Sequence, residues 1–190
     1  MTSSFYFTSK CIEKGGTILE QEELTEWFDS YGESLLTYIL LMVRDYQQAE
    51  DLTQETFIKA YKHYQQFENK SSLKTWLFSI AHNVTKDYFR KKHPLQHYLG
   101  LTMEEKDYKP IPEQIVVMNL QTEKLYNAIQ QLKPSYRQVI ILRKLKEFST
   151  VETAFVLNWS ESKVKMTLKR ALVELKNELI KGGVTDEILR

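Results

Sequence analysis

The apolar residues between Ser71 and Lys92 recur at steps of three and four, and this spacing restricts the possible folds more than any other feature of the chain. Residues at that spacing lie on one face of an α-helix. Ser72 precedes the stripe and can cap the first free backbone N–H groups. Three cations end the stretch before Pro94, as suits a helix C-terminus. The stripe consists of Leu73, Trp76, Leu77, Ile80, Ala81, Val84 and Tyr88.

Other stripes of the same period predict an all-α protein. One helix is expected from about Glu20, with an acidic outer face, and another from about Gln48 to Gln66 after a turn at Asp45–Gln48. Gly (6) and Pro (4) are too scarce for the regular short turns of an all-β chain. Residues 94–112 have no clear period and read as a flexible linker between two small helical domains. The expected division is an N-terminal extension 1–20, a first domain 21–93, the linker 94–112, a second domain 113–183 and a tail 184–190.

Charge and cysteine content narrow the class of protein. A net charge of +1 means that a nucleic-acid-binding chain of this kind must gather its cations into patches. The single cysteine, Cys11, excludes an internal disulfide framework and suits a reducing compartment. The longest apolar run, Leu35–Val43, is shorter than the roughly 18 residues of a membrane span, and no signal peptide is recognisable. We expect a cytoplasmic protein with no membrane insertion.

Enzymatic chemistry finds little support in the sequence. The four histidines have no cysteine or second histidine at metal-ligand spacing, and no Gly-rich phosphate loop or G-x-S-x-G motif occurs. We therefore expect no catalytic residues, no metal, no cofactor and no small-molecule substrate.

The segment from Ser149 to Lys181 predicts a helix-turn-helix. Ser149 can cap a short helix, Asn158-Trp159 reads as the turn, and Ser160 can cap a longer second helix. From Ser160 to Lys181 there are six bases against three acids, with several bases in the first turns, which would enter a major groove. A helical hairpin within an ordinary bundle remains the alternative for this segment alone.

Aromatic residues alternate with cations between Tyr61 and Lys92. Rings can stack on unpaired bases while cations hold the backbone phosphates, so the pattern suits single-stranded nucleic acid. Several of the same rings fall on the apolar stripes, and core packing explains them equally well.

Two blocks of the chain together resemble the extracytoplasmic-function (ECF) class of RNA polymerase sigma factors. AEDLTQETFIKAYKHYQQF, followed by SSLKTWLFSIAHNVTKDYFRKK, is similar to region 2 of that class. LKPSYRQVIILRKLKEFSTVETAFVLNWSESKVKMTLKRALVELK is similar to region 4. The blocks occur in the family's order, and the resemblance covers about Leu24 to Leu179. It implies a protein that binds core RNA polymerase and directs promoter recognition and melting, with an anti-sigma factor holding it until a stress or envelope signal arrives.

The resemblance also implies roles for individual residues. The β′ clamp helices of core polymerase would bind Asp51, Gln54 and Glu55, which share a face of their helix. Region 4 would dock on the β-flap and read the −35 element as duplex. The residues implied for the −10 element are Asn69, Lys70, Ser71, Ser72, Lys74, Trp76, Asn83, Lys86 and Arg90. The residues implied for the −35 element are Glu161, Ser162, Lys163, Lys165, Met166, Lys169 and Arg170.

Some positions depart from the family pattern. Thr153-Ala154 replaces a bulky aliphatic residue followed by alanine, and Trp159 replaces a small aliphatic residue in the turn. Thr167 stands where a cation is common, which bears on the −35 preference. Two other functions stay open from the residues alone: a DNA-binding regulator that does not join polymerase, and a helical adaptor with no nucleic-acid role.

Overall fold

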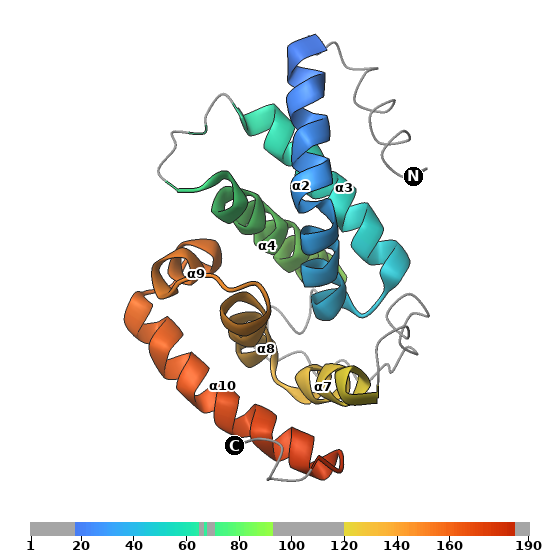
Figure 1. Ribbon diagram of the computed structural model, residues 1–190. Helices are drawn as coiled ribbons and strands as arrows, with labels where there is room; N and C mark the ends of the chain where they lie inside the picture. The colour runs from blue at the N-terminus through green and yellow to red at the C-terminus, as the bar shows by residue number, and fades with distance from the viewer. Residues whose placement is uncertain (1–17, 65–66, 68–70, 93–119, 185–190) are drawn as a thin grey trace.

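The structure is a computed structural model that describes residues 18–64, 67, 71–92 and 120–184, and within these ranges all regular structure is helical (Figure 1). The expected extension up to residue 17, the linker 94–112 and the tail beyond 184 lie outside the described residues. The helices are α2 (Ile18–Val43), α3 (Tyr46–His63), α4 (Leu73–Lys92), α7 (Leu120–Gln131), α8 (Pro134–Ile140), the π-helix η2 (Ile141–Leu145), α9 (Thr150–Leu157) and α10 (Glu161–Lys181).

Helices α2, α3 and α4 form the first helical group. They pack on one another through large side chains that water does not reach, among them Tyr38, Phe57 and Phe78. The rings of Tyr38 and Phe78 lie 5.4 Å apart between centroids. Such rings bury much apolar area and account for most of the packing free energy in a small helical core.

The connection between α2 and α3 is shorter than the turn expected at Asp45–Gln48. Arg44 adopts a positive φ of 62°, which reverses the chain directly after α2. Asp45 is then the N-cap of α3, and its carboxylate accepts a hydrogen bond of 3.1 Å from the Gln48 backbone N–H. The acid thus begins the helix, because a cap satisfies backbone donors that the first turn leaves unpaired.

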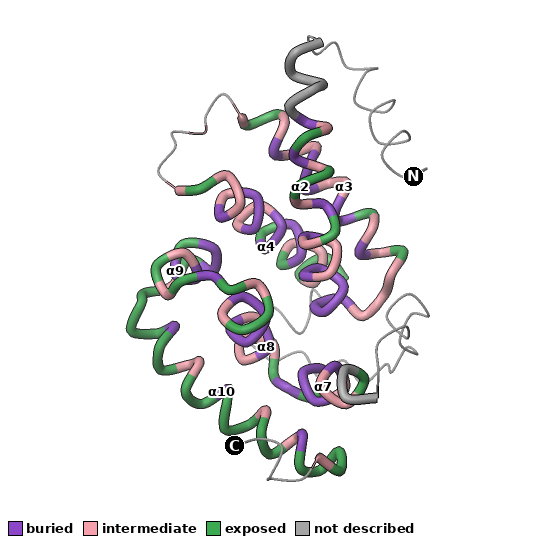
Figure 2. Tube along the Cα trace, in the orientation of Figure 1, coloured by how far each residue is buried: buried purple, intermediate pink, exposed green. Residues whose placement is uncertain are grey.

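Helices α7 to α10, with η2, form the second helical group. The long helix α10 packs along α7, α8 and α9 and buries Val164, Ala171 and Leu179. Leu172, expected on the buried stripe, is 38% exposed instead. The buried face of α10 is therefore narrower than the sequence pattern indicates, and most of its surface faces solvent (Figure 2).

The two helical groups pack together and share one continuous core (Figure 1). Helix α4 lies against α9, and α2 touches α8. Phe148, which follows η2, inserts between the groups and meets Phe78 edge to face with centroids 4.8 Å apart. The sequence pattern predicts both groups, but it does not predict that they close on each other.

Candidate nucleic-acid interface

A helix-turn-helix forms from α9, a tight turn and α10, as the sequence predicts. Ser149 and Glu152 make a reciprocal capping box at the start of α9, which lowers the pKa of Glu152 because its carboxylate accepts hydrogen bonds from Ser149. Asn158 ends the helix in the left-handed conformation, with φ of 52°. The Ser160 hydroxyl accepts from the Lys163 backbone N–H at 3.3 Å and begins α10. Caps at both helices fix the angle between them.

The residues expected to read duplex DNA line the open side of α10. Val164 and Ala171 are fully buried and hold the helix on its own group. All seven predicted −35 residues are exposed, namely Glu161, Ser162, Lys163, Lys165, Met166, Lys169 and Arg170. A helix that buries only one narrow face and presents cations in its first turns has the form of a recognition helix.

Two contacts position cations at the start of α10. The Lys163 ammonium lies 4.2 Å from the ring centre of Trp159, so the turn residue that departs from the family pattern supports a cation. Lys165 lies 3.8 Å from the Glu161 carboxylate, and both side chains remain mostly exposed. So loose an exposed pair contributes little to stability and leaves Lys165 able to exchange its partner for a phosphate.

The residues expected to bind the −10 element have different surroundings. Asn69 and Lys70 lie outside the described residues. Ser72 caps α4, because its hydroxyl accepts from the Thr75 backbone N–H at 3.1 Å, while Ser71 is half-buried. Asn83, Lys86 and Arg90 are exposed and recur along one face of α4, with Arg90 paired to Asp87 at 3.0 Å.

Aromatic rings anchor the segment that leads into α4. Phe67 lies between Tyr64, which stacks on it at 6.4 Å, and Trp76, 4.9 Å away between centroids. Tyr64 in turn meets Trp27 of α2 at 4.6 Å. Trp76 is thus partly buried in a row of rings. The structure places it in packing, and stacking on a base would require its remaining exposed surface.

Lys74, predicted for strand contact, is engaged by the second helical group. Its ammonium donates to the Lys146 carbonyl oxygen at 3.2 Å and lies 4.8 Å from the centre of the Phe148 ring. Burial lowers the pKa of the neighbouring Lys146. Sequence reasoning missed this contact, because nothing local marks Lys146 or Phe148 as neighbours of α4.

The predicted polymerase-binding residues lie together on α3. Asp51 is exposed, and Gln54 and Glu55 are half-buried, with Glu55 paired to Lys59 at 2.8 Å. Gln54 also lines a recess of about 230 Å³ between α2 and α3. The face is polar and open, and the second helical group contacts the molecule elsewhere, through α2 and α4.

A cavity of about 380 Å³ lies between the two groups. His82 and Tyr38 meet there, with the Tyr38 hydroxyl 3.3 Å from His82 Nδ1. Burial, with a smaller contribution from Lys86, lowers the pKa of His82 from 6.5 to about 4. Burial also raises the pKa of Tyr38. Both side chains are therefore neutral near pH 7, and their contact is one between neutral groups.

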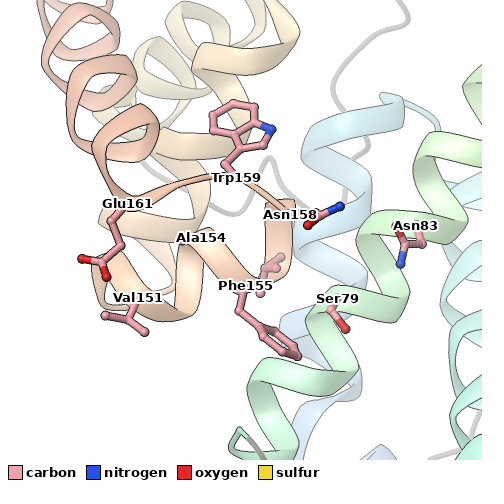
Figure 3. A pocket seen from close by; sticks show the side chains of 9 residues that line it. Ser79, Asn83, Val151, Ala154, Phe155, Asn158, Trp159 and Glu161 are labelled. Atoms are coloured by element: carbon pink, nitrogen blue, oxygen red, sulfur yellow. The ribbon is translucent and has the colours of Figure 1, made fainter.

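A second cavity, of about 560 Å³, opens between α4 and the helix-turn-helix (Figure 3). Ser79 and Asn83 of α4 form one wall, and Phe155 of α9 points toward Ser79 (Figure 3). Phe155 is 46% exposed. The cavity thus separates a predicted strand-binding residue, Asn83, from the helix-turn-helix by a partly open space.

Neither a metal site nor a membrane span is present in the parts that the structure describes. No group of three or more His, Cys, Asp or Glu side chains among those residues could hold a metal ion. No described helix is both long and apolar enough to cross a bilayer.

Comparisons with known proteins match the two groups of helices separately. The Sigma-70 region 2 family model matches residues 27–94, and the Sigma-70, region 4 model matches residues 122–175. These ranges contain the face of α3, all of α4 and the helix-turn-helix described above.

Full-length relatives carry both segments. The chain is 38% identical over 170 residues to the ECF RNA polymerase sigma factor SigX of Bacillus subtilis, an alignment that covers 86% of this chain and 88% of the relative. It is 32% identical over 168 residues to the ECF RNA polymerase sigma factor SigM of the same organism, covering 86% and 99%.

A solved structure has a similar arrangement of helices. The sigma factor RpoE in complex with the anti-sigma factor NepR, from Bartonella quintana, matches with a TM-score of 0.68 and 26% identity, over 84% of this chain and 98% of that one. Members of the family are transcription initiation factors and not enzymes. With both regions in order and a relative matched along most of its length, the chain belongs to the extracytoplasmic-function class of RNA polymerase sigma factors.

Proposed function

We propose that this sigma factor directs transcription initiation through three surfaces: the polar face of α3 for core polymerase, α4 for the −10 element and α10 for the −35 element. The observation that carries the proposal is the exposure of all seven predicted −35 residues on a capped second helix of a helix-turn-helix. Such a helix can place its first turns in a major groove, where base edges are distinguishable.

The duplex and the melted strand call for different chemistry. On α10, Lys165 and Lys169 hold phosphates while neighbouring polar side chains reach base edges. On α4, the exposed row Asn83, Lys86 and Arg90 suits the backbone of an unpaired strand. Capture of unstacked bases by the segment before α4 lowers the free energy of the open duplex, so melting follows from differential binding and needs no bond chemistry.

The polar face of α3 supports a role in polymerase binding. Asp51, Gln54 and Glu55 form no part of the core, and an acidic surface on α3 is of no use against DNA. We propose that these residues contact the β′ clamp helices and that the second group docks on the β-flap.

We further propose that an anti-sigma factor binds this chain, because the RpoE relative was solved with one, NepR. Core polymerase and promoter DNA, the partners proposed above, meet in the bacterial cytoplasm. We therefore propose that the protein acts there and has no catalytic activity of its own. We also propose the boundaries 21–93 and 113–183 for its two domains.

A DNA-binding regulator that acts without polymerase is the rival function. It shares the helix-turn-helix and has no use for the polar face of α3. The test is co-elution of the purified protein with sigma-free bacterial core RNA polymerase, comparing the wild type with Asp51→Ala, Gln54→Ala. We expect the double variant to lose at least about tenfold in affinity, as truncation of central interface residues does.

The control is a second pair of substitutions on the same helix, Gln47→Ala with Lys62→Ala, both at exposed positions. These should leave co-elution unchanged. Circular dichroism should show that all variants keep their helices. Failure of the folded wild type to co-elute would favour the rival function.

A further inference from the structure

Polar side chains join the C-terminal end of α2 to the second helical group. The Gln130 amide donates to the Leu41 carbonyl oxygen at 3.0 Å, and its own side-chain oxygen accepts from Arg44 Nε at 2.7 Å. The Arg44 guanidinium also donates to the Gln130 backbone carbonyl. Arg137 donates to the Met42 carbonyl oxygen at 3.5 Å. Carbonyls in the last turn of a helix lack donors within it, and the opposite group supplies them here.

The residues of this contact are buried and mutually matched. Gln130 is 3% exposed and Arg137 is 7% exposed. Arg137 also donates to the carbonyls of Gln130 at 2.8 Å and Leu132 at 3.0 Å, so it ties α7 to α8 as it reaches across. Buried polar groups demand partners, and these find them only in one relative placement of the two groups.

The backbone of Arg44 adds an independent observation. Its φ of 62° lies in the left-handed region, where a side chain costs free energy that glycine avoids. Glycine is therefore the residue that local geometry favours after α2. What arginine supplies and glycine cannot is the pair of hydrogen bonds to Gln130.

A second contact closes the N-terminal end of α4. Besides the Lys74 contacts with Lys146 and Phe148, the Thr75 hydroxyl donates to the Glu152 carboxylate at 3.2 Å. Thr75 is fully buried. The capping acid of α9 thus also holds α4, directly beside the segment proposed to capture the melted strand.

We propose that these two contacts form an intramolecular latch, which keeps the free chain closed and covers the start of α4 until polymerase or promoter DNA opens it. The latch residues are Arg44, Thr75, Gln130, Arg137 and Glu152. This inference rests on the proposed function of α4. In the closed state α10 and the polar face of α3 stay accessible, so core polymerase can bind before the latch opens.

The test measures closure itself, without polymerase or DNA. The full chain carries Cys11→Ser and fluorophores on Lys62→Cys and Asn177→Cys, two exposed positions on opposite groups. Single-molecule energy transfer should show one high-transfer population. The variants Arg44→Gly and Gln130→Ala should each raise the ratio of open to closed molecules about tenfold, since each removes hydrogen bonds across the interface. Adding Thr75→Val should raise it further.

Arg44→Gly is the decisive variant, because glycine suits the local backbone and should not weaken the fold of α2. The matched control Gln47→Ala removes an exposed glutamine and should keep the wild-type distribution. The latch is refuted if the wild type already samples a broad range of transfer, or if Arg44→Gly with Gln130→Ala keeps the single high-transfer population.

The same labelled proteins separate this inference from the proposed function. Added core polymerase should convert the wild type to low transfer. If the latch variants open but polymerase binds none of the proteins, the latch stands and the proposed function fails. If polymerase binds and the latch substitutions change nothing in the free chain, the proposed function stands and the latch fails.

Discussion

The two helices proposed to contact DNA are presented in opposite ways. Helix α10 exposes every predicted contact residue and is fixed by Val164 and Ala171 within its own group. Helix α4 exposes Asn83, Lys86 and Arg90, but its first turn is covered by the second group through Lys74 and Thr75. The duplex reader is ready in the free chain, whereas the strand reader is only half available.

The difference follows from what each ligand requires. A duplex exists before polymerase arrives, so a preformed recognition helix lowers the cost of binding it. An unpaired strand appears only during melting, and an exposed aromatic and cationic surface would meanwhile bind other single strands with little sequence preference. Closure of the two groups restricts that surface to the moment when it is needed.

The largest expected effect comes from a charge placed beneath α10. Val164→Asp puts a carboxylate at a site with no exposed surface and should destabilise the second group by about 3–5 kcal/mol. Duplex binding should be lost with the fold. Urea unfolding followed by circular dichroism measures the first, and fluorescence anisotropy of a labelled duplex measures the second.

The exposed neighbour serves as the control for that substitution. Met166→Asp should keep the unfolding free energy within about 0.5 kcal/mol and weaken only DNA binding. Equal destabilisation by both substitutions would contradict the division of α10 into a buried and an open face.

A smaller effect is expected at the closed side of α4, where His82 is buried beside Tyr38. The unfolded residue titrates near 6.5 and the folded one near 4, so the unfolded state binds more protons between these values. The contribution to stability is complete above pH 6.5 and falls as the pH drops toward 4. The expected loss is about 2 kcal/mol at pH 5 relative to pH 7.

The measurement is urea unfolding at several pH values, with His82→Asn beside the wild type. The variant should show a flatter dependence on pH between 7 and 5 than the wild type. His63→Asn, on the exposed surface of α3, should keep the wild-type slope. A slope that survives in His82→Asn would assign the acid sensitivity to other groups.

The smallest effect on folding is expected from the cations of α10. Lys165→Ala with Lys169→Ala should leave the unfolding free energy within about 0.5 kcal/mol, because both side chains are exposed. The slope of log affinity for duplex DNA against log salt should fall by about 2, one phosphate contact for each lysine. Lys62→Ala on α3 should not change the slope, and an unaltered slope in the double variant would remove these lysines from the phosphate contacts.

Sequence alone predicts the features that depend on neighbours along the chain. Ser72, Ser149 and Ser160 cap the helices that the pattern assigns to them, because a cap needs only a hydroxyl and the next turn. The buried face of α10 follows from its period for the same reason. The turn before α3 was misplaced, since Asp45 can equally end a turn or begin a helix, and only the geometry of Arg44 decides between them.

The closure of the two groups could not be predicted. Gln130 and Leu41 are far apart in the chain, and a glutamine beside an apolar stripe looks like any partly exposed residue. Arg137 falls among buried aliphatic residues and could have drawn attention as a buried cation. Its partners are backbone carbonyls, however, which no sequence pattern identifies. The roles assigned to individual side chains toward DNA and polymerase stay predictions.

The π-helical turn Ile141–Leu145 makes the spacing of this segment intolerant of deletions. A π turn contains one residue more than the α-helical turn it replaces, and here the Lys146 backbone N–H reaches back five residues to the Ile141 carbonyl at 2.9 Å. Loss of a single residue would restore ordinary winding and rotate everything that follows by about 100°. Phe148 would then leave Phe78, and the helix-turn-helix would point in another direction. Relatives that differ in length by one residue at this place should therefore present their recognition helices at a different angle to the first group.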